Sequence, residues 1–468
     1  MNFLKDIKTK VSNYLNLSKK NAELKSLLSL QSKELLELKA YIKKLETQLN
    51  ILSVKKDSHN SSMSPSSDIV KKNQSLRIKS NKKPGGQNGH KGETLKLSKT
   101  PDEVIELIPN YCNHCGLPLD NEKKKLKSKR QVVDIPPPVL PIYTEYRNYK
   151  IKCTCGHCQD SSYPQGVDNY IQYGPNIQSA ITYQSVYQYI PYKRLQDFLK
   201  QWYSLNLSQG TITNILNKMA NKALPLYNAI KGSLEQATSV GSDETGASVN
   251  GKKQWMWVWQ NSLMTFISLA NSRGQKVITK LFPNGFVNAI IGTDRWAAQL
   301  NTQAKGHQLC MAHLLRDLVY LIETEKSSFA KQIKELFSHA IKLKKQKLKY
   351  SKDDPIVLQV ESKLEALLKK ELSTEDYKKT ETFRKSMVKH RNSIFTFLYY
   401  ENVEPDNNAS ERAIRNIKVK QKISGQFKTD KGGDNFAILR TVIDTAIKNK
   451  VDVKEILNLI ARSNHCPV

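Results

Sequence analysis

Residues 237–270 confine this part of the chain to an antiparallel β-sheet. The pair Asn250-Gly251 is a strong hairpin signal, because both residues tolerate the positive φ angles of a two-residue turn. After this turn, tryptophans at positions 255, 257 and 259 alternate with Met256 and Val258 at the period of a strand. We expect them to form a packed face of the sheet; the alternative is a surface that stacks on bases. Asp243 precedes the turn and therefore lies on the first strand.

The charge of the chain indicates a polyanionic partner. The 468 residues contain 74 Lys and Arg against 43 Asp and Glu, a formal net charge of +31. Such a surplus attracts nucleic acid in a salt-dependent way. The length suits about two to four domains of roughly 100–200 residues each. No uncharged apolar run approaches the ~18 residues of a membrane span, and no secretory leader is evident, so we expect a soluble, cytoplasmic protein with no membrane partner.

Residues 1–52 predict a helical coiled coil. From residue 21 onward one heptad position is occupied by Asn21, Leu28, Leu35, Ile42 and Leu49, and the other by Leu24, Gln31, Leu38, Leu45 and Leu52. This pattern favours a homodimer or higher oligomer; the alternative is an amphipathic helix packed on its own domain. Residues 53–100 follow as a basic flexible linker with few large apolar side chains. They form either a solvated linker or a basic arm along DNA phosphates, in which Lys82, Lys83 and Lys91 would take part.

Residues 101–165 predict a zinc-binding module. Cys112 and Cys115 have the spacing of one thiolate pair, and a second group follows about forty residues later. In that group Cys155 and Cys158 have the commoner ligand spacing, whereas Cys153 is an alternative ligand. Unliganded buried thiols are the other interpretation of these cysteines.

Residues 170–232 predict a helical region with a helix-turn-helix. Apolar residues from Leu195 to Trp202 mark the first helix, and Ser208 is a plausible N-cap for the second. Such a pair can present a recognition helix to DNA, although periodicity alone also fits an ordinary helical hairpin.

Two more acids stand in suggestive places. Asp294 ends an apolar run before a helical start, and Glu411 lies in a late helix that carries several bases, namely Arg412, Arg415, Lys418, Lys420 and Lys422. Together with Asp243 they give three separated carboxylates, which a pair of Mg²⁺ ions would require for phosphoryl displacement. Carboxylate sites accept Mn²⁺ as well. By spacing alone this signal is weak, because three acids can be chosen from 43 in many ways.

Several strings together resemble the transposases of insertion-sequence family 66, in order from about residue 55 to 450. They are KPGGQNGHKGETL, IPYKRL, LSQGTI, SDETG, GTDRW, HQLCMAHLLRDL and NNASERAIRNIKVKQKISG, together with the CxxCG module. The resemblance implies an α/β, RNase H-like mixed sheet with flanking helices in a catalytic domain over residues 235–450. A helical insertion would span about residues 327–400, and a C-terminal helix and tail residues 451–468.

The resemblance further implies a DDE triad of Asp243, Asp294 and Glu411 that binds two Mg²⁺ ions. The function expected is a bacterial DNA transposase that cleaves element ends and transfers them into target DNA, with structural zinc, nucleoid association and possible accessory proteins of the same element. The five bases beside Glu411 would hold phosphates or, alternatively, form a solvated helix face. The rival function is a catalytically silent DNA-binding protein derived from a transposase.

Four residues near the acids invite separate predictions. Glu244 adjoins Asp243, but neighbouring side chains of a strand point to opposite faces, so we expect only Asp243 at the metal site. Cys310 and His313 have a C-x2-H spacing that several DDE transposase groups share, and they form either a packed core pair or metal ligands. Trp296 is expected in the core, with stacking on an unpaired base as the alternative.

Overall fold

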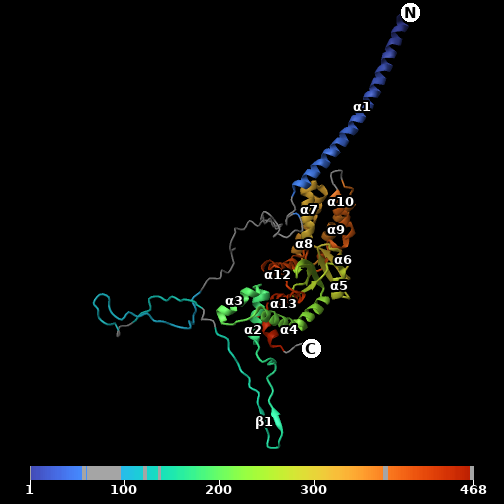
Figure 1. Ribbon diagram of the computed structural model, residues 1–468. Helices are drawn as coiled ribbons and strands as arrows, with labels where there is room; N and C mark the ends of the chain where they lie inside the picture. The colour runs from blue at the N-terminus through green and yellow to red at the C-terminus, as the bar shows by residue number, and fades with distance from the viewer. Residues whose placement is uncertain are drawn as a thin grey trace.

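The computed structural model describes residues 2–54, 60, 96–119, 124–134, 139–372 and 378–463. Lys82, Lys83 and Lys91 lie outside the described residues. The long helix α1 (Asn2–Ser53) extends from a body of helices and strands, and two loop regions extend from the same body in other directions (Figure 1).

The centre of the described chain is a five-stranded mixed sheet in the order β5-β4-β3-β6-β7. Its strands are β3 (Ser239–Val249), β4 (Lys252–Gln260), β5 (Thr265–Ala270), β6 (Phe286–Thr293) and β7 (Ala304–Leu309). Strands β3, β4 and β5 pair antiparallel, whereas β6 is parallel to both β3 and β7. Flanked by helices, this sheet has the mixed α/β architecture that the family resemblance implies.

The predicted hairpin is confirmed. Asn250 and Gly251 join β3 to β4 with φ angles of 47° and 72°, as a tight turn between twisted strands requires. Trp257 and Trp259 are 0% and 1% exposed and stack with ring centroids 5.4 Å apart. These two tryptophans therefore form a packed face of the sheet, as expected, and not a surface for bases.

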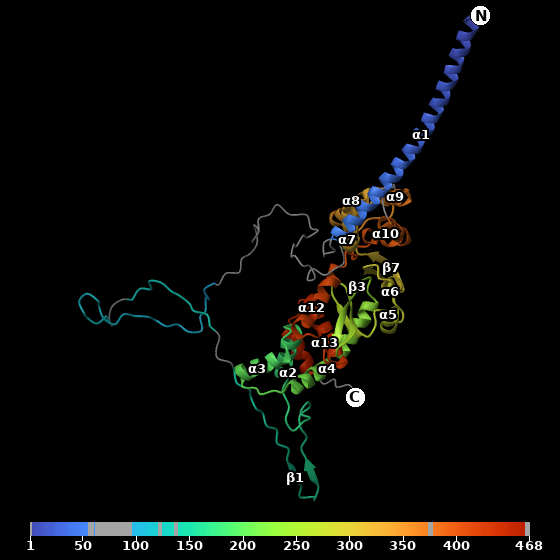
Figure 2. The ribbon, with the colours of Figure 1, turned by 45° about the horizontal axis from the view of Figure 1, so that its top comes forward.

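Each face of the sheet is covered by helices (Figure 2). The face that carries Trp257 packs on α5 (Gln275–Leu281) and α6 (Ala297–Leu300). The face that carries Val258 packs on α12 (Asn408–Ser424) and α13 (Asp430–Lys448). Directly opposed residues of an antiparallel pair project to the same side, so the pairs Asp243–Val258 and Glu244–Trp257 place the two acids on opposite faces. The predicted opposite orientation of the two acids is confirmed, and Asp243 lies on the face that packs on α12.

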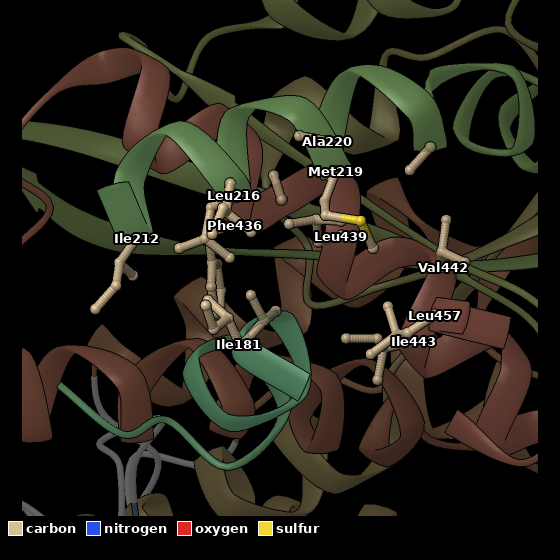
Figure 3. Packing of buried hydrophobic residues seen from close by; sticks show 14 of the residues in the cluster. Ile181, Ile212, Leu216, Met219, Ala220, Phe436, Leu439, Val442, Ile443 and Leu457 are labelled. Carbon is tan, nitrogen blue, oxygen red and sulfur yellow. The ribbon is translucent and has the colours of Figure 1, made fainter. Parts of the chain in front are cut away.

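A second group of helices precedes the sheet. It comprises α2 (Pro175–Thr182), a π-helix (Tyr183–Tyr187), α3 (Tyr192–Tyr203) and α4 (Gln209–Glu235), with α14 (Val453–Arg462) packed on α2. Ser208 caps α4 as predicted, because its Oγ accepts the N–H of Thr211 at 3.0 Å. Side chains of α2, α4, α13 and α14 meet in one core, which includes Ile181, Met219 and Leu439 (Figure 3).

The helices that follow β7 have a core of their own. They are α7 (Met311–Glu325), α8 (Ser328–Gln346), α9 (Pro355–Lys369), α10 (Lys378–Lys389), a 3-10 turn (Arg391–Ser393) and α11 (Thr396–Tyr399). Phe337, Phe395 and Phe397 lie in this core. The chain then returns to the sheet through α12.

The described residues that precede α2 are largely exposed to solvent. The end of α1 contacts α7, while Leu28 and Leu38 of its predicted heptad stripe are 61% and 59% exposed. A short hairpin of β1 (Lys150–Lys152) and β2 (Cys158–Asp160) extends from the body (Figure 1). No helix in the described ranges is long and apolar enough to cross a lipid bilayer.

One glycine permits the contact between α12 and β3. A Cβ on Gly241 would lie 2.7 Å from Asn407 Oδ1, Gln260 Nε2 and Ser410 Oγ. Because Cβ atoms do not approach heavy atoms that closely, a side chain here would push the first turn of α12 away from the strand.

We therefore expect Gly241→Ala to lower the free energy of unfolding by roughly 1–3 kcal/mol through overpacking. The matched control is Gly246→Ala on the same strand, where the added Cβ would meet Lys253 Cε at an ordinary 3.7 Å. Urea denaturation measures both variants. Equal stabilities of the two would contradict the tight contact at Gly241.

Candidate active site

Asp243 and Asp294 lie side by side because of the strand register. Gly241 of β3 pairs with Gly292 of the parallel strand β6, and each acid lies two residues further along its chain. Asp294 follows the last residue of β6, at an open pocket that Trp296 and His390 also line. The backbone N–H of Glu244 donates to Asp243 Oδ1 at 2.8 Å, and the N–H of Trp296 donates to Asp294 Oδ1 at 3.1 Å.

Glu411 reaches the same place from the first turn of α12. Asn407, at the start of this helix, donates from its side chain to the carbonyl of Ser242 at 2.8 Å, directly before Asp243. Its backbone N–H donates to Cys310 Sγ at 3.2 Å. These two hydrogen bonds fix the first turn of α12 against β3 and against the start of α7.

The three predicted acids therefore converge, and their charges interact. Burial raises the pKa of Asp243 well above its ordinary value, and the nearby carboxylates of Asp294, Glu244 and Glu411 raise it further. Glu411 Oε1 is buried and accepts no hydrogen bond. This oxygen therefore keeps an unused hydrogen-bond acceptor, although the Arg316 guanidinium lies within ion-pair distance of it.

Helix α7 contributes His313, whose role the sequence left open, and Arg316, which the sequence analysis missed. Arg316 Nη1 lies 3.7 Å and His313 Nε2 4.0 Å from Glu411 Oε1, and Arg295 forms an ion pair with Asp317. Burial, followed by the charge of Arg316, lowers the pKa of His313 and favours its neutral form. The helical spacing of His313, Arg316 and Asp317 was the signal that could have revealed this shared face.

Cys310 and Trp296 have distinct structural roles. Cys310 is 2% exposed and accepts the Asn407 hydrogen bond, and burial raises the pKa of its thiol to about 12. This location agrees with the core interpretation of Cys310, whereas His313 lies beside Glu411. Trp296 is 36% exposed and is therefore not the core residue we expected.

The carboxylates suit a hard divalent cation by chemistry, although they do not form a closed cage. Among the described residues, no three His, Cys, Asp or Glu side chains lie close enough together to hold a metal ion. Mg²⁺ usually binds through one or two carboxylates and keeps several waters, so a closed protein cage is not required. The buried Glu411 oxygen that accepts no hydrogen bond and the crowded negative charge at Asp243 are features that a bound cation would relieve.

The bases of α12 divide into two groups. Arg412, Arg415, Lys418 and Lys422 are exposed. Although Lys418 is exposed overall, partial burial of its ammonium group lowers its pKa, and repulsion by Lys422 and Lys253 lowers it further. Lys420 is different: it is 9% exposed, its Nζ lies 3.5 Å from the carbonyl of Ser185, and burial lowers its pKa to about 8. Its predicted contact with DNA phosphates does not fit this buried position.

The cysteines predicted to bind zinc lie on two separate loops (Figure 1). Cys112 and Cys115 flank a turn closed by the Gly116 N–H on the Cys112 carbonyl at 2.9 Å, and hydrogen bonds within this turn lower the pKa of Cys112. Cys153, Cys155 and Cys158 lie on the β1–β2 hairpin. The structure does not bring the two groups together.

Comparison with known families gives two matches. The model of the Transposase IS66 family matches residues 170–435, which include all three acids and more than half of the chain. A family of unknown function, DUF6444, matches residues 11–96. Comparison with curated proteins found no match.

The raised pKa of Asp243 predicts a stability that depends on pH. Ionisation of this carboxyl costs more in the folded state than in the unfolded chain, so the cost is absent below the ordinary pKa of 3.8. This free-energy cost grows as the pH rises from the ordinary pKa through the raised pKa. It amounts to about 1.4 kcal/mol for each pKa unit by which the folded and unfolded states differ. In EDTA, Asp243→Asn should therefore unfold at a higher temperature than the unmodified protein at pH 7.5, and this gain should vanish toward pH 4.

Thermal denaturation across this pH range measures the effect, with Asp353→Asn as the control at an exposed loop position. A variant at position 243 that is no more stable than the unmodified protein at pH 7.5 would contradict the raised pKa of Asp243.

Proposed function

The chain belongs to the Transposase IS66 family, and on that premise we propose that it is a DDE-type transposase. Its function would be divalent-metal-dependent cleavage at the ends of an insertion sequence, followed by transfer of those ends into target DNA. The observation that supports the proposal is that Asp243, Asp294 and Glu411 lie near one another at one end of the five-stranded mixed sheet.

These three carboxylates would hold Mg²⁺ or Mn²⁺. When bound, such ions stabilise both the attacking and the leaving oxygen of an in-line phosphoryl displacement. Asp243 would contribute a ligand whose negative charge a cation would offset, because burial and the neighbouring carboxylates raise its pKa. Asn407 and Cys310 would keep Glu411 in place through the first turn of α12.

DNA would lie along the exposed side of α12. Arg412, Arg415, Lys418 and Lys422 follow one another from the acids toward the β3–β4 hairpin, where Lys253 adds a further positive charge. Such bases neutralise phosphates and hold a strand without reading its sequence. Sequence recognition would belong to the helix-turn-helix of α3 and α4.

Retention of the acids favours an enzyme over a silent DNA-binding protein. A cluster of buried like charges destabilises the fold, and a protein that only binds DNA gains nothing from it. The rival function remains one outcome of the test below.

The proposal is tested with labelled DNA that carries the terminal repeats flanking the gene, in Mg²⁺, in Mn²⁺ and in EDTA. Glu411→Gln removes one carboxylate without a change of shape. We expect this variant to bind the repeats with unchanged affinity and to lose end cleavage by roughly 10³-fold or more.

The control is Glu455→Gln, which makes the same change in the first turn of α14 and should cleave normally. Binding without cleavage by the unmodified protein under every metal condition would favour the silent DNA-binding function. Loss of both binding and cleavage in Glu411→Gln would assign Glu411 a structural role.

We further propose that α1 pairs with a second copy as a coiled coil. A transposase must hold two element ends, and the exposed heptad leucines of α1 provide a stripe for this purpose. Leu35→Glu should reduce the dimer population in sedimentation experiments. The adjacent Leu36→Glu lies off the stripe and should not, although Leu36 is similarly exposed, at 67% against 56%. Equal effects of the two variants would contradict this pairing.

A structural zinc site is the remaining proposal. Cys112 and Cys115 would supply two thiolates, and Cys155 and Cys158 the other two, with Cys153 as the alternative. The lowered pKa of Cys112 supports thiolate formation. Elemental analysis of the purified protein should find one zinc per chain that is lost in Cys115→Ser. Purified protein free of zinc would rule the site out.

A further inference from the structure

Glu244 is a buried acid that the proposed chemistry does not use. Its side chain is 1% exposed and lies on the face of the sheet opposite to Asp243. One carboxylate oxygen accepts from Arg273 Nε, and the other accepts from Gln299 Nε2 at 2.6 Å. A buried carboxylate with both oxygens satisfied has a defined orientation and can fix the groups that it binds.

Arg273 connects this carboxylate to Trp296. Its guanidinium lies 3.8 Å from the centroid of the Trp296 ring and 5.2 Å from that of Trp255. The indole N–H of Trp296 also donates to the backbone carbonyl of Arg273 at 3.0 Å. Trp296 is therefore held by both the side chain and the backbone of one residue.

The contacts continue to Asp294. The backbone N–H of Trp296 donates to Asp294 Oδ1 at 3.1 Å, so the position of Trp296 determines where this carboxylate points. A second route runs through Gln299, whose side-chain oxygen accepts from the hydroxyl of Thr293, the residue before Asp294. Both routes start at Glu244 and end beside the second acid of the site.

We propose that Glu244 and Arg273 are positioning residues that fix the Asp294 carboxylate relative to Asp243. The inference rests on the proposed function, because it assigns these residues to the same metal-binding site. Asp243 and Glu244 are neighbours on one strand, so a single strand would provide a ligand on one face and the anchor for a second ligand on the other.

Arginine suits this position for two physical reasons. Its planar guanidinium can pair with a carboxylate in its plane and stack on an indole above it, which a lysine ammonium does not do equally well. Its charge also offsets that of Glu244, which is a fourth acid near Asp243 and Asp294.

The test is the affinity for Mn²⁺ alone, measured by calorimetry on the full chain without DNA. The affinity of the proposed site is taken from the part of the Mn²⁺ binding heat that is absent in the variant Asp243→Asn. Arg273→Gln should weaken this Mn²⁺ affinity by about 10- to 100-fold, the usual cost of losing a group that orients a metal ligand. Arg273→Lys, which keeps the charge and is therefore more certain to fold, should weaken it by about 10-fold.

The matched control is Arg440→Lys. Arg440 pairs with Asp444 and lies near two aromatic rings, with Tyr187 and Tyr189 at 5.6 Å and 5.3 Å, but it has no link to Asp294. It should lose thermal stability and keep its Mn²⁺ affinity. This comparison separates positioning from the general loss of a stacked ion pair.

Two further outcomes are distinguishable. A folded Arg273→Lys with unchanged Mn²⁺ affinity, or an Arg440→Lys weakened to the same degree, would overturn the positioning role. An unmodified protein that shows no Mn²⁺ heat dependent on Asp243 would instead contradict the proposed metal site itself, whatever the variants do.

Discussion

The contact between the first turn of α12 and strand β3 is the interaction on which the candidate site depends. It brings together residues 165 positions apart in the chain, through the hydrogen bond from Asn407 to the carbonyl of Ser242 and through the close approach that Gly241 permits. The helices after β7 form a separate core and return the chain to this one place. Without the contact, Glu411 would have no fixed relation to Asp243.

Electrostatics connects this geometry to function. The chain carries a net charge of +31, yet four acids lie near one another at the end of the sheet: Asp243, Glu244, Asp294 and Glu411. Folding works against the repulsion among them, and Arg316 and Arg273 offset only part of it. This repulsion lowers the stability of the protein without a bound ion. Such a cost is expected at a site whose ligand is a cation. The exposed bases of α12 extend from this acidic centre along one helix and give a surface suited to phosphate.

Local signals in the sequence predicted local structure well. The Asn250-Gly251 turn, the Ser208 cap and the opposite faces of Asp243 and Glu244 follow from backbone geometry, which depends on only a few neighbouring residues. The family resemblance, which the family comparison confirmed, supplied the three acids. The structure brings those acids together, but their catalytic role is still a prediction.

Features that depend on packing were not predictable. Lys420 is a helix-surface base by its sequence, and only the position of the π-helix shows that it is buried. Trp296 was expected in the core, yet it lies at the edge of the site. It is held there by Arg273, which comes from the loop after β5. The sequence around Arg273 and Gln299 does not indicate their role, because both contact Glu244, and only the pairing of the strands brings Glu244 near them.

The central claim is that Asp243, Asp294 and Glu411 form one metal site. A crystal structure with Mn²⁺ and element-end DNA, recorded at a wavelength where manganese scatters anomalously, tests it most directly. The account predicts anomalous peaks bounded by carboxylate oxygens of all three residues and a DNA phosphate beside them. Manganese bound elsewhere, with these carboxylates free of metal in the presence of DNA, would contradict it.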